Sequence, residues 1–102
     1  MMTVINRPFR FGEYEFGWDA EAVSPDYSAK VRKGSYVAAL DIHRDGVTGS
    51  FGGAVFVFLR SRGPAGSKAV RTRVIPCVEP TVERAAQVLI KEVTAVFTEL
   101  LA

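Results

Sequence analysis

The sequence predicts an α+β fold: a four-stranded antiparallel meander sheet followed by one long C-terminal amphipathic helix packed on one face. Two features of the chain carry this prediction. Before residue 79, apolar residues recur at every second position or form short runs bounded by Gly, Pro and Asp, which is typical of strands. From residue 82 onward, the apolar period becomes about 3.6 residues, which is typical of a helix.

The first predicted strand covers residues 14–22, where aromatic residues and alanines alternate with acidic residues and glycine. A turn follows at residues 24–27, because the proline there presets the backbone angle that a turn needs. The hairpin closed by this turn places two pairs of opposite charge on the solvent side, Glu21 opposite Lys30 and Asp19 opposite Arg32.

The second predicted strand continues to about His43 and contains one irregularity. We expect a β-bulge at Gly34, because one extra residue there keeps the aromatic residues of both strands on one face. The register that follows sets Phe16 beside Tyr36 and Tyr14 beside Ala38. The Asp45-Gly46 dipeptide, a strong turn signal, ends this strand.

The third and fourth predicted strands, residues 51–62 and 68–78, form a hairpin around a Gly/Pro loop. Residues 54–59 of the third strand are apolar at every position, so both faces of the strand are apolar. One helix covers one face only. Either the sheet curls round on itself or a second molecule covers the other face, and the sequence leaves open which face the helix takes.

The helix is predicted to begin at Val82, after a proline and a threonine that suit a helix start. Its apolar residues fall within an arc of roughly 160° on a helical projection. Leu89 and Val93 occupy the centre of that arc, so we expect both to face the sheet.

Length and composition predict one domain spanning residues 1–102 with the order β-β-β-β-α. The longest apolar run is far shorter than the roughly 20 residues of a membrane span. The first ten residues also lack the apolar run of about 7 to 15 residues that a secretory signal needs. With Cys77 as the single cysteine, we expect a soluble cytoplasmic protein with a buried thiol and no membrane partner.

Positive charge is concentrated in the middle of the chain. Residues 30–78 hold nine basic and two acidic residues, whereas the segments on either side are net acidic. Such a local field attracts anionic partners. The sequence therefore predicts a nucleic-acid-binding surface formed by Arg60, Arg62, Lys68, Arg71, Arg73 and Lys33. An apolar strip edged by arginines also suits a protein interface, for which the candidates are Val55, Val57, Leu59 and Ile75.

Residues that could support catalysis or metal binding do not form a recognised motif. His43 is flanked at alternate positions by Asp41 and Asp45, but same-face side chains of a strand are about 7 Å apart, which is long for ligands of one metal ion. The glycines between residues 46 and 53 match neither a P-loop nor a dinucleotide-binding motif. We therefore expect no catalytic residue, no cofactor and no metal ion.

Three functional hypotheses remain. The first is a small non-enzymatic binding module, self-associating, whose basic hairpin contacts an anionic partner such as single-stranded nucleic acid. The second is a dimeric protein-interaction module without nucleic-acid binding, in which the arginines keep an edge soluble. The third is an enzyme or a small-ligand carrier with a site at an oligomer interface or between helix and sheet. The sequence identifies neither the partner, nor any sequence specificity, nor the oligomeric state.

Overall fold

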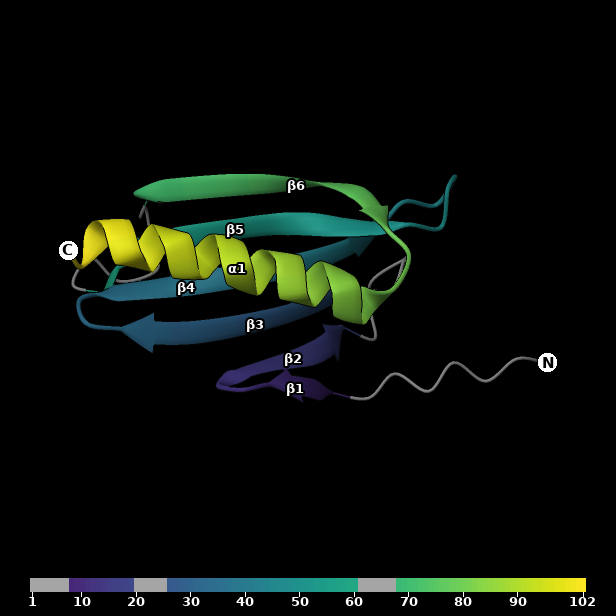
Figure 1. The fold of residues 1–102 in the computed structure, drawn as a ribbon. Coiled ribbons are helices and arrows are strands. Elements are labelled where there is room, and N and C mark those ends of the chain that lie inside the picture. Colours follow the sequence, from purple (N-terminus) through teal and green to yellow (C-terminus); the bar gives the residue numbers. More distant parts are fainter. Residues whose placement is uncertain (1–7, 20–25, 61–67) are drawn as a thin grey trace.

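The computed structural model describes residues 8–19, 26–60 and 68–102. Within these residues, one antiparallel sheet contains six strands in sequence order, followed by one helix. The elements are β1 (Phe9–Phe11), β2 (Tyr14–Asp19), β3 (Asp26–Lys33), β4 (Tyr36–Arg44), β5 (Phe51–Leu59), β6 (Arg71–Glu79) and α1 (Val82–Leu100). The helix runs back from the end of β6 and lies across β4–β6 (Figure 1). The α+β class, the antiparallel meander and the helix packed on one face are confirmed.

The sheet has six strands rather than four because the chain turns more often than predicted. The expected bulge at Gly34 is a two-residue hairpin turn, across which Lys33 pairs with Tyr36. Gly34 has φ +58°, in the left-handed region where glycine carries no steric penalty. A second tight turn, with Gly12 at φ +59°, creates β1, which the sequence reading missed.

These turns change the register of the first half of the sheet. Phe16 pairs with Phe9, not with Tyr36, and Tyr14 pairs with Phe11, not with Ala38. The expected pair of Asp19 with Arg32 is also wrong, since Asp19 lies opposite Asp26. Glu21, the expected partner of Lys30, lies outside the described residues.

The second half of the sheet follows the prediction more closely. In the β5–β6 hairpin, Val57 pairs with Arg71 and Val55 with Arg73. The predicted hairpin, with residue 62 opposite residue 68, differs from this register by two residues. Because side chains alternate with a period of two, such a shift leaves every residue on its predicted face.

The helix begins and packs as predicted. Thr81 is the N-cap: its backbone is extended, and its hydroxyl accepts a hydrogen bond from the Arg84 amide at 3.2 Å. Leu89 and Val93 have no exposed surface, which confirms that the centre of the apolar arc faces the sheet. In the described part of the chain, no helix has the length and apolar character needed to cross a membrane.

The core lies between α1 and one face of the sheet and continues beyond the helix over β2 and β3. The sheet residues that form this core are Tyr14, Phe16, Ala29, Val31, Ala38, Leu40, Ile42, Val55 and Val57. We call this side of the sheet the covered face. At its β1 end, the ring of Phe9 stacks on Phe16 with centroids 5.1 Å apart and meets Tyr27 edge-on at 5.4 Å. Cys77 is half-buried rather than fully buried as predicted.

Candidate functional site

The side of the sheet that points away from α1 is not covered by any other described element. The sheet order makes β1 and β6 its two edges, so the sheet does not close on itself. Side chains alternate between faces along each strand, which assigns a second set of residues to this open face. The open face of β3–β6 consists of Ser28, Lys30, Arg32, Val37, Ala39, Asp41, His43, Ala54, Phe56, Phe58, Thr72, Val74, Pro76 and Val78.

The interface predicted from the sequence lies on the covered face, which is a correction to that prediction. Val55 and Val57 have no exposed surface, because α1 packs on them. Ile75 is partly buried and packs against the same core, and Leu59 shares the parity of Val55 and Val57. The apolar side chains that a partner can reach are therefore those on the opposite side of the same strands.

The predicted basic cluster is divided by the fold. Lys33 forms an ion pair with Glu13 at 2.8 Å, and the hydrogen bond that Lys33 donates to this carboxylate, together with the charge of Glu13, raises the pKa of Lys33. Arg73 reaches Glu99 of the helix at 3.6 Å, so it also lies on the helix side of the sheet.

The remaining predicted cations lie near the ends of β5 and β6. Arg71 donates to the carbonyl of Val70 at 2.8 Å and stands opposite Val57, on the helix side. Arg60 and Lys68 are exposed, and Arg62 lies outside the described residues. The six predicted cations thus do not share one described surface.

Two cations that the sequence reading treated as neutralised are exposed on the open face. Lys30 stands opposite Ala39 and Arg32 opposite Val37. Their predicted acidic partners depended on the register that proved wrong. Within the described residues, neither forms an ion pair, and the nearby acids are paired elsewhere: Glu15 with Arg10 and Glu13 with Lys33.

These two cations lie in line with two aromatic rings. One row across the sheet runs Arg32, Val37, Phe58 on β3, β4 and β5, and the next runs Lys30, Ala39, Phe56. Neighbouring strands are about 4.8 Å apart, so the Cα atom of each cation lies roughly 10 Å from the Cα atom of a phenylalanine. One smaller apolar residue lies between the two. Phe56 and Phe58 are half-buried and do not belong to the core beneath the helix.

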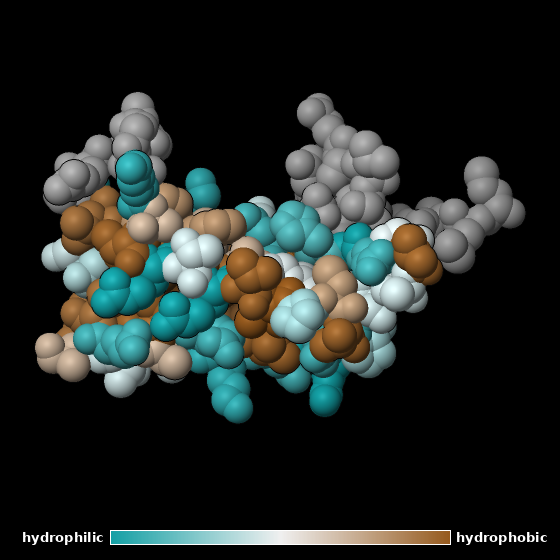
Figure 2. Space-filling view, turned by 90° about the horizontal axis from the view of Figure 1, so that it is seen from above, coloured by the Kyte–Doolittle hydropathy of each residue, from teal (hydrophilic) through white to brown (hydrophobic). Residues whose placement is uncertain are grey.

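The β6 side of the open face is apolar. Val74 and Val78 are 76% and 65% exposed. Figure 2 looks down on the β6 edge and shows apolar side chains in separate brown groups among polar ones. Cations therefore mark the β3 side of the open face, and apolar side chains mark the β6 side.

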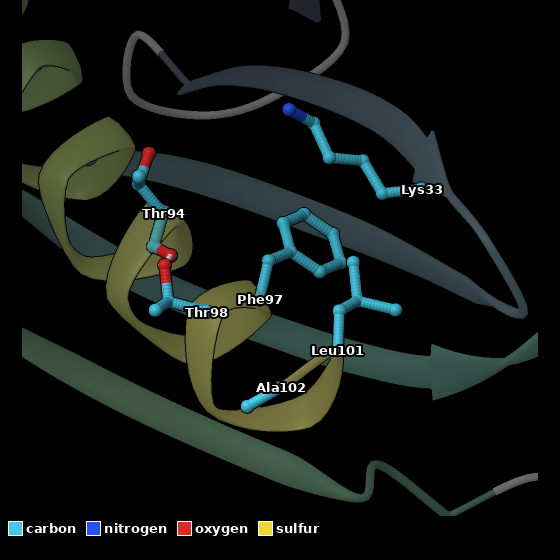
Figure 3. Close-up of a pocket in the computed structure, with 6 residues that line it drawn as sticks. All are labelled: Lys33, Thr94, Phe97, Thr98, Leu101 and Ala102. Carbon is cyan, nitrogen blue, oxygen red and sulfur yellow. Dashed lines mark hydrogen bonds between the residues drawn. The ribbon is translucent and has the colours of Figure 1, made fainter.

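A shallow hollow of about 430 Å³ at the end of α1 is the alternative site (Figure 3). Its polar groups are already engaged. The hydroxyls of Thr94 and Thr98 donate to the carbonyls of Ile90 and Thr94 at 2.7 and 2.9 Å, and Lys33 is paired with Glu13. The hollow thus offers a small ligand little beyond apolar contact.

A metal site has no support in the described part of the chain, where no group of three or more His, Cys, Asp or Glu side chains converges. The carboxylate of Asp45 instead accepts the Val47 amide at 2.9 Å within the β4–β5 turn. This backbone hydrogen bond lowers the pKa of Asp45.

Comparison of the chain with protein-family models, with curated proteins and with solved structures finds no match.

Proposed function

We propose that this protein is a non-enzymatic binding module that holds a polyanionic chain across β3–β5 on the open face of its sheet. The observation that carries the proposal is that Lys30 and Arg32 are exposed, adjacent on one strand, and unpaired among the described residues. A cation without a protein partner is available to a phosphate or another anion.

The charge balance of the open face supports this proposal. Among the open-face residues of β3–β6, Asp41 is the single acidic one; on the neighbouring β2, Glu15 lies on the same face between the buried Tyr14 and Phe16 and is paired with Arg10. Arg60 adds a further exposed cation at the Arg32 end, because its backbone amide donates to the Ser35 carbonyl at 2.8 Å. The positive region therefore follows one end of the face, where a flexible polyanion can contact several cations at once.

The proposal is tested by calorimetric titration with inorganic polyphosphate at two salt concentrations. We compare the parent with Lys30→Ala/Arg32→Ala and with the matched control Lys33→Ala/Arg73→Ala, which removes the same charge from the helix side. Binding that weakens with salt, about tenfold weaker in the first variant and little changed in the control, is expected. Equal losses in both variants, or no binding by the parent at low salt, would contradict the proposal.

A second candidate function is a protein-interaction module in which a second copy of the chain covers the open face. The exposure of Val74 at 76% and Val78 at 65%, both on the edge strand β6, favours it, because neighbouring exposed apolar side chains are typical of interfaces. Both candidates use the same face. They differ in whether a substitution on the β6 side of that face lowers the mass of the protein in solution.

A further inference from the structure

We infer that the anionic chain is a single-stranded nucleic acid and that Phe56 and Phe58 each stack on one of its bases. This inference rests on the proposed function and adds the class of ligand to it. Polyphosphate and nucleic acid share the phosphates that Lys30 and Arg32 contact. They differ in the bases, for which only the aromatic part of the face provides a partner.

The position of the two rings fits bases better than it fits core packing. Phe56 and Phe58 point away from α1, whereas Val55 and Val57 beside them fill the core. Both rings are half-buried among small neighbours such as Ala39. The backbone of Phe56 is paired with Ala39 on β4 and with Thr72 on β6, and that of Phe58 is paired with Val37 on β4, so both rings project from backbone that the sheet holds in place.

The spacing of the rings selects an unpaired strand. Same-face residues of a strand are about 7 Å apart. Successive bases of a duplex are about 3.4 Å apart and cover each other's faces. Two bases can therefore lie on two rings at this spacing only if the strand is unpaired and extended.

Each of the two phenylalanines has one cation in its own row across the sheet. Each row of the face combines one cation on β3 with one ring on β5, Lys30 with Phe56 and Arg32 with Phe58. The long side chains of lysine and arginine can extend over Ala39 and Val37 between them. Two successive nucleotides therefore find the same pair of contacts in the same order, a phosphate at the cation and a base at the ring.

The experiment compares phosphate-containing ligands with and without accessible bases. A labelled single-stranded oligonucleotide, the same strand with abasic sites, its duplex and inorganic polyphosphate are titrated into the parent and into Phe56→Leu/Phe58→Leu, which keeps the apolar area and removes the rings. The parent should bind the intact strand at least tenfold tighter than the abasic strand or the duplex. The leucine variant should lose about tenfold or more for the intact strand and nothing for the other ligands.

A rescue variant makes the result independent of folding. Phe56→Tyr/Phe58→Tyr keeps both rings and should bind the intact strand as the parent does, whereas a loss in this variant too would contradict stacking. Equal affinity of the parent for intact and abasic strands would overturn this inference and leave the proposed polyanion binding standing. No binding to any of the four ligands would overturn both. A parent dimer that the leucine variant dissociates would assign the rings to a second copy and overturn the inference as well.

Discussion

Neighbouring residues of β5 lie in opposite environments although their side chains are chemically alike. Val55 and Val57 have no exposed surface beneath α1, while Phe56 and Phe58 lie half-buried on a face that the described chain leaves open. The difference arises from the neighbouring elements rather than from β5 itself. On one side lies the apolar arc of the helix, and on the other side residues 8–19, 26–60 and 68–102 provide no second layer.

The comparison shows that an apolar run on both faces of a strand does not identify a core. The covered face pairs its β5 residues with Ala38 and Leu40, which complete the packing under the helix. The open face aligns its β5 residues with two cations on β3 instead. The composition of adjacent strands therefore distinguishes the face that forms the core from the face that we propose binds a partner.

The largest expected effect comes from placing a charge on the covered side. Val93→Asp should destabilise the protein by about 4 kcal/mol or more, because Val93 has no exposed surface and the carboxylate would be buried without a partner. Ala95→Asp, at an exposed position of the same helix, should cost less than about 1 kcal/mol. Urea unfolding followed by circular dichroism measures both, and similar values for the two variants would mean that α1 packs on another side.

The next largest loss of stability is expected between β4 and β5, the two interior strands on which both faces of the sheet depend. A Cβ atom at Gly53 would overlap the backbone oxygen of Asp41, so Gly53→Ala should cost about 3 kcal/mol through displacement of the two strands. Gly17→Ala is the control, because no atom lies within 4 Å of a Cβ built there. Thermal melts of both variants check this, and a Gly53→Ala protein as stable as the control would show that the strands are farther apart.

Substitutions on the two faces of β5 should differ by a smaller amount in the free energy of unfolding. Val57→Ala removes fully buried methyl groups and should cost about 2 kcal/mol, whereas Phe58→Leu should cost less than about 1 kcal/mol because its ring is already half in water. Chemical denaturation of the two single variants is sufficient. A larger cost for Phe58→Leu would indicate that a second layer covers the open face.

How far the sequence predicted the fold depends on how local each signal is. The helix was predictable because its period and its Thr81 cap lie within one segment. The β3–β4 turn has an equally local signal, since a two-residue loop with Gly34 first and Ser35 second is a hairpin pattern. It was missed because a bulge at the same glycine also matched the alternation of the aromatic residues.

The candidate site was harder to predict because it depends on register. The predicted pair of Asp19 with Arg32 is wrong because Asp19 lies opposite Asp26 in the β2–β3 register, and the predicted partner of Lys30, Glu21, lies outside the described residues. Which face of β5 the helix covers is decided by packing between distant segments, and no single segment encodes it. The sequence therefore indicated a positive region and an apolar strand, but not which cations and which apolar side chains share the open face.

A pH effect is expected on the covered side, smaller than the substitutions above. Burial raises the pKa of the Tyr14 hydroxyl above its ordinary value of 10.0, and a hydrogen bond with Thr94 partly opposes the rise. A raised folded-state pKa means that the associated stability is present below pH 10 and is lost as the pH rises through the folded pKa. Between about pH 9 and pH 11, the melting temperature of Tyr14→Phe should therefore fall less than that of the parent. Parallel curves for the two proteins would assign the alkaline loss elsewhere, with Tyr27, whose pKa burial also raises, as the next residue to test.

The smallest effect on stability is expected at the outer part of the open face. Val74 is 76% exposed, so Val74→Asp should change the free energy of unfolding by less than about 0.5 kcal/mol.

The same variant distinguishes the two candidate functions when its mass in solution is measured by light scattering coupled to size exclusion and compared with the chain mass of 11.1 kDa. If the open face is reserved for an anionic chain, the parent and Val74→Asp should have the same mass, because no copy contact is lost. If a second copy covers the face, a carboxylate at Val74 would be buried without a partner in the interface, and the mass should fall from about twice that value to the single chain. A fall of this kind would place the protein-interaction function ahead of polyanion binding.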